Sequence, residues 1–182
     1  MRVCFVCTGN ICRSPMAEVV LRHLALTTPL VDGSLLADHL TVSSAGTTSW
    51  HAGEPMDERA AGVLARHGYT DHGHRAQGFE ADQLGRLDLV VALDRGHYQT
   101  LQRLADQQAG RRGGSGQGRE ALAELVLLRS YDPSAGPALD VPDPYEGDEA
   151  GFESCLALVE AGCSGLAVAL ANELTSVNHS RS

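Results

Sequence analysis

A cysteine and an arginine near the start of the chain have the spacing of an anion-binding nucleophilic loop. Cys7 and Arg13 frame the segment CTGNICRS, with five residues between them and Ser14 directly after. A thiolate is a strong nucleophile, and a guanidinium can hold two phosphate oxygens at once. Five residues are enough to turn the backbone so that successive amide groups point inward at a tetrahedral anion. The segment therefore predicts a loop that binds an anion above a reactive sulfur.

The sequence around this loop predicts a strand before it and a helix after it. Residues 2–6 form a short β-prone run, and SPMAEVVLRHLAL carries apolar side chains at helical spacing. Ser14, Pro15 and Glu18 are typical of a helix start, because proline lacks an amide hydrogen and an acid favours the first turn. Open α/β sheets bind ligands between the carboxyl end of a strand and the amino end of a helix.

The residues of the loop also favour an ionised sulfur. Helix amino termini and neighbouring cations stabilise a thiolate, so we expect Cys7 to be ionised beside Arg13. Gly9 permits a backbone conformation with positive φ, and Ser14 can donate a hydrogen bond to the sulfur. The Walker A pattern is absent, so nucleotide hydrolysis is not indicated.

Strand-like and helix-like segments alternate along the rest of the chain. Apolar runs predict three further buried strands at residues 39–44, 87–93 and 125–128. Apolar side chains at helical spacing predict helices at residues 57–67, 94–107 and 148 to about 174. This alternation predicts an α/β domain with a parallel sheet.

We expect one domain over residues 1–174. The chain has 182 residues, of which 43% are hydrophobic and 20% charged, as is usual for a single globular domain. Residues 108–120 are Gly-rich and polar, which predicts a flexible surface insert. Residues 175–182 are expected to form a disordered tail.

Composition excludes several classes of protein. The net charge of −9 disfavours a nucleic-acid binder, which needs a basic stripe. The first residues lack the apolar core of a signal peptide, and no apolar run reaches the roughly 20 residues that span a bilayer, so we expect a cytoplasmic protein without a membrane anchor. The five cysteines are an odd set without Cys-x-x-Cys spacing, which argues against a disulfide framework or a zinc site.

The segment VCTGNICRSPMAE resembles the amino-terminal signature of the low-molecular-weight protein tyrosine phosphatases of bacterial type. The resemblance continues through SAGT at residues 44–47, Trp50, GEPMD at residues 53–57 and DPY at residues 143–145, and so covers nearly the whole chain. It implies a single doubly wound domain, with a four-stranded parallel sheet and helices on both faces. It also implies hydrolysis of phosphotyrosine and aryl phosphate monoesters through a phosphocysteine on Cys7.

Expulsion of a phenolate needs a proton donor opposite the nucleophile. Asp143 is the candidate, because Pro142 and Pro144 stiffen the loop that would hold its carboxyl over the pocket. The resemblance assigns this residue the acid role and then the base role when water attacks. Asp132 with Pro133 mimics the motif but lacks the following aromatic residue, and is interpreted as a turn former.

Two aromatic residues are expected to form the walls of the substrate pocket. Trp50, the only tryptophan, lies in the polar segment TTSWHAGEP and is expected to stack on the substrate ring, with Tyr145 opposite. Family members often carry a second aromatic residue where this chain has Glu146, whose carboxylate would disfavour strongly acidic substrates.

The loop residues themselves are expected to bind the substrate: Thr8, Gly9, Asn10, Ile11, Cys12 and Ser14. By resemblance, a supporting network holds the loop without reacting: Asn10, Ser14, Ser44 and His74. Asn10 tolerates a left-handed backbone better than most residues. Cys12 could capture a sulfenic acid formed on Cys7 as a disulfide, which is a hypothesis for redox regulation.

No cofactor or metal is expected, because thiolate, guanidinium and backbone dipoles supply the chemistry. His72 and His74 lack an evident third ligand for a metal. The expected partner is a phosphotyrosine-containing protein or an aryl phosphate, bound by a monomer or weak dimer.

Three other functions remain as alternatives. An arsenate reductase uses a similar loop but relays oxidation through later cysteines, and here Cys155 and Cys163 fall on the expected C-terminal helix, away from the strand ends. A related phosphatase acts on phosphoarginine, where a threonine is expected at the position of Ile11. A catalytically dead phosphotyrosine-binding module would tolerate loss of Cys7 or Asp143, and both are present.

Overall fold

Four parallel strands form the centre of the protein. A computed structural model describes residues 1–112 and 122–179. The sheet has the order β2-β1-β3-β4, and its strands are β1 (Arg2–Cys7), β2 (Thr41–Gly46), β3 (Leu89–Ala92) and β4 (Glu124–Leu127). The predicted four-stranded parallel sheet is confirmed.

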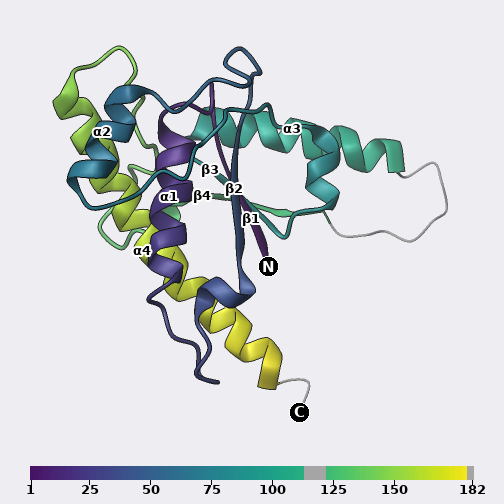
Figure 1. Cartoon of the computed structure of the whole chain (residues 1–182). Helices are drawn as coiled ribbons and strands as arrows, with labels where there is room; N and C mark the ends of the chain where they lie inside the picture. The colour runs from purple at the N-terminus through teal and green to yellow at the C-terminus, as the bar shows by residue number, and fades with distance from the viewer. Residues whose placement is uncertain (113–121, 180–182) are drawn as a thin grey trace.

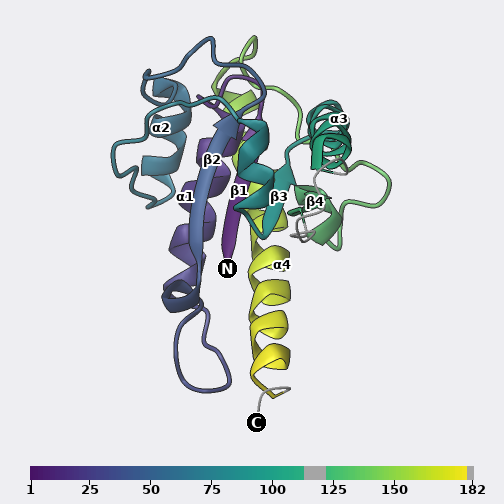
Figure 2. The same ribbon diagram turned by 90° about the vertical axis from the view of Figure 1, so that its right-hand side faces the viewer.

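Helices cover both faces of this sheet, as expected for a doubly wound domain. The helices are α1 (Arg13–Ala25), α2 (Glu58–Arg66), α3 (Arg95–Arg112) and α4 (Glu149–His179), with short 3₁₀ turns η1 (Leu36–His39), η2 (Ala81–Gly85) and η3 (Leu128–Tyr131). In Figure 1, α1 and α2 lie to the left of the sheet, α4 runs from the left to below it, and α3 extends to the right. Figure 2 shows α1 and α4 running alongside the strands, on the face of the sheet opposite α3.

The central strands are apolar because both of their faces are buried. Val3 and Phe5 of β1 contribute to the core under α1 and α4, while Cys4 and Val6 point to the core under α3. This alternation follows from the two-residue period of a strand. All four residues of β3 are likewise buried.

The strand order places the loop after β1 at a topological switch point. From β1 the chain passes through α1 to β2 on one side, whereas β3 pairs with β1 on the other side. Cys7 pairs with Gly46 and Val6 pairs with Ala92, so the carboxyl ends of three strands meet at one edge. Ligands of open α/β sheets bind at such a point.

Two predicted boundaries of disorder are wrong. Helix α3 continues to Arg112, so residues 108–112 of the expected insert are helical, and residues 113–120 lie outside the described part. Helix α4 continues to His179, five residues into the expected tail. Both extensions are polar, so they lack the apolar spacing that reveals a helix in sequence, yet adding residues to an existing helix needs no new nucleation.

Two local details also differ from expectation. Strand β2 lies two residues later than predicted, because residues 36–39 form η1 and Gly46 still pairs with Cys7. Helix α1 begins at Arg13, so Glu18 lies beyond the first turn and does not serve as the expected helix-start acid.

Helix α4 contributes many apolar side chains to the core on the face of the sheet that it shares with α1. Over Glu149–Ser176 it is long and apolar enough to cross a membrane, by length and composition only. Its buried side chains Phe152, Leu156, Val159 and Leu166 belong to the core, and the helix packs against α1, α2 and η3. These apolar side chains are therefore packed inside the protein.

Close packing of α4 on η3 requires glycine at one position. A Cβ atom built on Gly165 would lie 1.9 Å from the backbone oxygen of Tyr131. Replacement Gly165→Ala is expected to lower the free energy of unfolding by about 1–3 kcal/mol, even though alanine favours a helix. Urea unfolding measures this change.

Gly62 on α2 is the matched control, since the nearest atom to its built Cβ is Arg66 Nη1 at 3.7 Å. Replacement Gly62→Ala should stabilise the protein by up to about 1 kcal/mol. Equal stability of Gly165→Ala and the wild type would contradict the close packing of α4 on η3.

Candidate active site

The sulfur of Cys7 lies within the loop that joins β1 to α1. Cys7 is buried, with Sγ 3.0 Å from Ser14 Oγ. The backbone N–H of Asn10 donates to the same sulfur at 3.3 Å. Two hydrogen-bonding groups thus converge on Sγ close to the amino end of helix α1.

The loop is held at the sheet edge by continuation of the strand pairing. Thr47 N donates to Cys7 O at 2.8 Å, and Thr48 N donates to Thr8 O at 3.0 Å. A Cβ atom on Gly46 would lie 2.7 Å from Thr8 O, so this approach needs glycine. The SAGT segment therefore positions the loop through its backbone.

Asn10 organises the interior of the loop. Its φ of 58° makes it the only non-glycine residue with positive φ in the described ranges. Its Nδ2 donates to Ser14 Oγ and to Ser44 Oγ, both at 2.9 Å, and its backbone oxygen lies 2.7 Å from His74 Nε2. The four residues of the expected network therefore meet in one place. Gln77, whose N–H donates to Asn10 Oδ1 at 2.9 Å, was not foreseen.

A partly buried carboxylate, that of Glu18, extends this network away from the loop. Ser44 Oγ donates to Glu18 Oε2 at 2.5 Å, and Glu18 Oε1 pairs with Arg22 Nη2 at 2.6 Å. Because Asn10 Nδ2 can only donate, Ser44 Oγ accepts from Asn10 and gives its own proton to Glu18. The carboxylate thus fixes the direction of the whole chain of hydrogen bonds.

Arg13 is a buried cation held by groups from two segments that are far apart in sequence. Its side chain is 4% exposed, and Nη1 donates to Asp94 Oδ2 at 2.8 Å and to Val141 O at 3.1 Å. Its Nη2 donates to Asp143 Oδ2 at 2.6 Å. A buried charge needs such partners, because an unpaired one is strongly destabilising.

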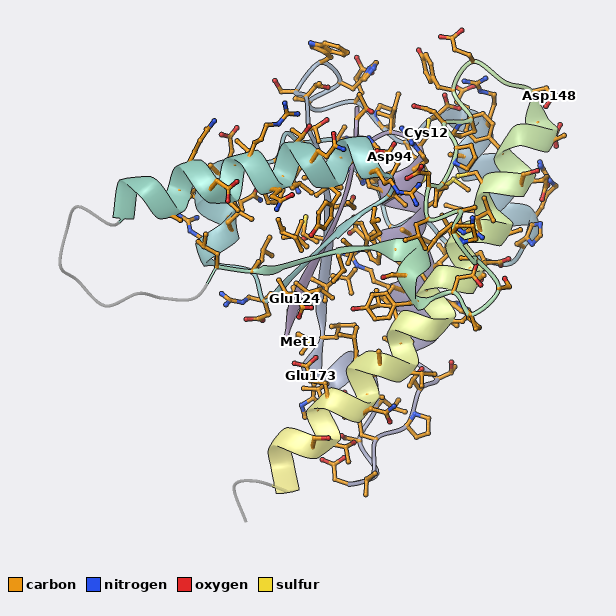
Figure 3. The ribbon with its side chains drawn as sticks, turned by 180° about the vertical axis from the view of Figure 1, so that it is seen from behind. Met1, Cys12, Asp94, Glu124, Asp148 and Glu173 are labelled. Carbon is orange, nitrogen blue, oxygen red and sulfur yellow. The ribbon has the colours of Figure 1, made fainter. Side chains whose placement is uncertain are left out.

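Asp94 is a site residue that sequence reasoning identified only as the start of a helix. It directly precedes α3, and its Oδ1 accepts from the backbone N–H of His97 at 2.8 Å, as an N-cap does. Its other oxygen binds Arg13. Figure 3 shows Asp94 and Cys12 near one end of the sheet and Glu124 and Met1 toward the other. An acidic residue just after a buried strand is the signal that could have revealed it.

Asp143 lies on a loop that is tied to the end of β3. Val141 N donates to Leu93 O at 2.8 Å, and Asp143 Oδ1 accepts from Tyr145 N at 3.1 Å. The Asp143 side chain is 52% exposed, so its carboxyl faces both Arg13 and solvent. Asp132, by contrast, bonds Ser134 in a turn, as expected.

The two expected aromatic walls are both accessible. Trp50 is 79% exposed in the segment after β2, and Tyr145 is 45% exposed. Arg59 of α2 lies 5.6 Å from the Tyr145 ring centroid and donates to Gly147 O at 3.1 Å. Arg59 thus ties α2 to the loop that carries Asp143 and Tyr145.

His51, which sequence reasoning missed, covers part of the loop. A Cβ atom on Gly9 would lie 2.8 Å from His51 Cδ2. Gly9 therefore allows close packing against His51. Its φ is not positive, so the positive φ that the sequence suggested for Gly9 is not observed. Ile11 and Cys12 are buried, and Ile11 O accepts from Asp57 N at 2.8 Å.

The five cysteines are free thiols. Burial raises the pKa of Cys12 well above its usual value, and burial raises that of Cys155 to about 12. Cys155 and Cys163 lie on α4, as expected. The Cys7–Cys12 disulfide stays a prediction.

No group of three or more His, Cys, Asp or Glu side chains in the described residues could hold a metal ion. His74 instead contacts the backbone of Asn10.

Loss of the Ser44 hydroxyl should loosen the loop. Replacement Ser44→Ala leaves one Asn10 N–H and one Glu18 oxygen without this partner, which is expected to cost about 1–3 kcal/mol of unfolding free energy. Amide hydrogen exchange of residues 7–13 should also accelerate. Ser43→Ala, on the same strand as Ser44, is the control, because Ser43 Oγ donates to Val3 O of β1 and not to the loop. Equal exchange in the two variants would contradict the network.

Comparison with known proteins agrees with this geometry. The family described as low molecular weight phosphotyrosine protein phosphatase matches residues 2–176. A low molecular weight protein-tyrosine-phosphatase of Streptomyces coelicolor is 49% identical over 174 residues, 95% of each chain. Low molecular weight protein-tyrosine phosphatase A of Mycobacterium tuberculosis is 46% identical over 172 residues, 91% of this chain and 89% of that protein.

Solved structures show the same fold. YfkJ of Bacillus subtilis superposes with a TM-score of 0.76 at 31% identity, covering 95% of this chain and 96% of that one. The Drosophila arginine phosphatase superposes with a TM-score of 0.75 at 28% identity, covering 91% and 95%. From sequence and structure together, the chain belongs to the low molecular weight phosphotyrosine protein phosphatase family.

Proposed function

We propose that this protein hydrolyses phosphotyrosine in proteins, and other aryl phosphate monoesters, through a phosphocysteine intermediate on Cys7. The observation that carries the proposal is the convergence of Ser14 Oγ and Asn10 N–H on Cys7 Sγ, with the buried guanidinium of Arg13 on the same loop and Asp143 beside it. These groups match a nucleophile, a charge stabiliser and a proton donor.

In the first step, the Cys7 thiolate attacks phosphorus, and the bond from phosphorus to the phenolic oxygen breaks. Asp143 gives its proton to the departing phenolate, so that a neutral phenol leaves. Arg13 and the backbone amides of the loop complement the charge on the equatorial oxygens. Ser14 stabilises the sulfur as a leaving group for the next step through its 3.0 Å contact.

In the second step, water attacks the phosphocysteine and restores the enzyme. Asp143 takes a proton from the water, the bond from phosphorus to sulfur breaks, and inorganic phosphate leaves. The same carboxyl therefore acts first as acid and then as base. Its contact with Arg13 at 2.6 Å supports this role, because it puts the carboxyl beside the group expected to bind the phosphate oxygens.

The proton-donor role requires Asp143 to change partners. Its Oδ2 accepts a hydrogen bond from Arg13 Nη2, so this oxygen is not free to face a leaving group. A bound phosphate dianion would compete for the same guanidinium and so release the carboxyl. Substrate binding and release of the Asp143 carboxyl from Arg13 are thereby coupled in this proposal.

The pocket walls support an aromatic substrate. Trp50 and Tyr145 present exposed rings on two loops, and aromatic rings stack favourably on a phenyl group.

The thiol, guanidinium and carboxyl account for the reaction without a metal or cofactor. We further propose a cytoplasmic enzyme that acts as a monomer or weak dimer.

A phosphoarginine phosphatase is the second candidate, because the similarity to the Drosophila arginine phosphatase spans most of both chains. The buried, apolar Ile11 stands where such enzymes are expected to carry threonine, which favours an aryl ester. Parallel assays with a phosphotyrosine and a phosphoarginine peptide distinguish the two. The arsenate reductase alternative is weaker, since it assigns no role to Asp143.

Substitution of the nucleophile and the acid tests the mechanism. Cys7→Ser should abolish hydrolysis of aryl phosphates, since an alcohol is not ionised near neutral pH. Asp143→Ala should lower kcat by about 10²–10⁴-fold for a basic leaving group and less for an activated one such as nitrophenol. Steady-state kinetics across a series of substituted phenyl phosphates measures both.

Asp148→Ala is the control for loss of a carboxylate in the same segment, because Asp148 Oδ1 bonds Gly151 N at the start of α4. Its kcat should show no dependence on leaving group beyond that of the wild type. A leaving-group dependence unchanged in Asp143→Ala would remove Asp143 from the acid role.

A further inference from the structure

A buried histidine that the reaction scheme leaves without a role lies between Thr8 of the phosphate-binding loop and the carboxylate of Asp94. His97, in the first turn of α3, is 5% exposed. Its Nε2 lies 2.9 Å from Thr8 Oγ1, and its Nδ1 lies 3.0 Å from Asp94 Oδ1. The imidazole therefore spans the gap between the residue after the nucleophile and the carboxylate that holds Arg13.

These contacts close a ring of four side chains. Asp94 Oδ2 accepts from Arg13 Nη1 at 2.8 Å, and Arg13 Nη2 reaches back to Thr8 Oγ1 at 3.5 Å. Starting from Arg13, the ring passes through Asp94, His97 and Thr8 and returns to Arg13. Each member is fixed from two sides, so the direction of the guanidinium depends on all of them.

The charges that face His97 determine its protonation. Burial lowers the pKa of His97 to about 4, and Arg13 also lowers it, while Asp94, Asp143 and Asp140 raise it. The ring is therefore neutral near pH 7 and carries one N–H. That proton belongs on Nδ1, because an N–H dipole 3.0 Å from Asp94 Oδ1 is attracted to the carboxylate, whereas a nitrogen lone pair at that distance would be repelled by it.

The Nδ1 contact is electrostatic and not a hydrogen bond. Although the two atoms are 3.0 Å apart, Nδ1 has no partner with hydrogen-bond geometry in the described part of the chain. With the proton on Nδ1, Nε2 must accept from the Thr8 hydroxyl. The hydroxyl proton is then engaged by His97, and the lone pairs of Thr8 Oγ1 stay available to accept from Arg13.

We propose that His97 is a positioning residue, which orients the Thr8 hydroxyl so that its oxygen accepts from Arg13 and the guanidinium keeps the angle needed for the transition state. This role rests on the proposed function of Arg13. Small misplacement of a catalytic group can slow a reaction by up to ~10²-fold. An effect of up to this size is therefore expected for a residue that acts on Arg13 through Thr8.

Two amide substitutions separate the contacts of His97. The side-chain amide of His97→Gln can reach the position of Nε2 and accept from Thr8, whereas that of His97→Asn replaces only the group at Nδ1. We expect His97→Asn to lower kcat for an aryl phosphate by about 10- to 100-fold with a smaller change in KM. His97→Gln should recover most of that loss. The thermal midpoints of both variants separate loss of structure from loss of orientation.

Combination with Thr8→Val tests whether His97 acts through Thr8. If it does, His97→Asn adds little to the defect of Thr8→Val, because the hydroxyl that it orients is already gone. Multiplied defects in the double variant, or equal kcat for the Gln and Asn variants, would overturn the proposal. A lower thermal midpoint with unchanged kcat would also overturn it.

The outcome is separable from the proposed function. Turnover by Cys7→Ser would refute the phosphocysteine mechanism whatever the His97 variants do. An inactive Cys7→Ser protein together with a fully active His97→Asn protein would refute only the positioning role.

Discussion

A guanidinium that is almost wholly removed from water imposes a constraint on everything around it. The Arg13 side chain is 4% exposed, and a cation at that depth is stable only when anions and hydrogen-bond acceptors surround it. Its partners come from the loop before α3 and the loop before α4, which are far apart in sequence. The fold must therefore bring the ends of β1 and β3 and the 141–145 segment to one edge before the cation can be buried.

The parallel sheet meets this constraint through its strand order. Because β1 lies between β2 and β3, the loop after β1 has neighbours from both sides. On one side, the SAGT segment at the carboxyl end of β2 holds the loop through backbone hydrogen bonds and through Ser44. On the other side, Asp94 after β3 holds the arginine. The loop that carries the nucleophile and the cation is thus held from both sides of β1 in the sheet.

The local part of the site could be predicted from the spacing of its residues, and the family resemblance added Asp143, Ser44 and His74 from distant segments. The partners of Arg13 at Asp94 and Val141 were missed. Cys7, Arg13 and Ser14 stand within one short segment, so their spacing carries the geometry of the loop. Asp94 serves as both a helix cap and a partner of Arg13, and only the first role is visible in sequence. The acceptor at Val141 is a backbone oxygen, which has no sequence signal at all. The ends of α3 and α4 were missed because their last turns are polar.

The central claim is that the sulfur of Cys7 accepts the phosphoryl group. Rapid acid quench during turnover of an aryl phosphate, followed by mass spectrometry of the peptide that carries Cys7, tests this most directly. The account predicts a peptide heavier by one phosphoryl group that accumulates before steady state and disappears when the substrate is consumed. Turnover with no phosphoryl group on this peptide at any time, or with the group on another residue, would contradict it.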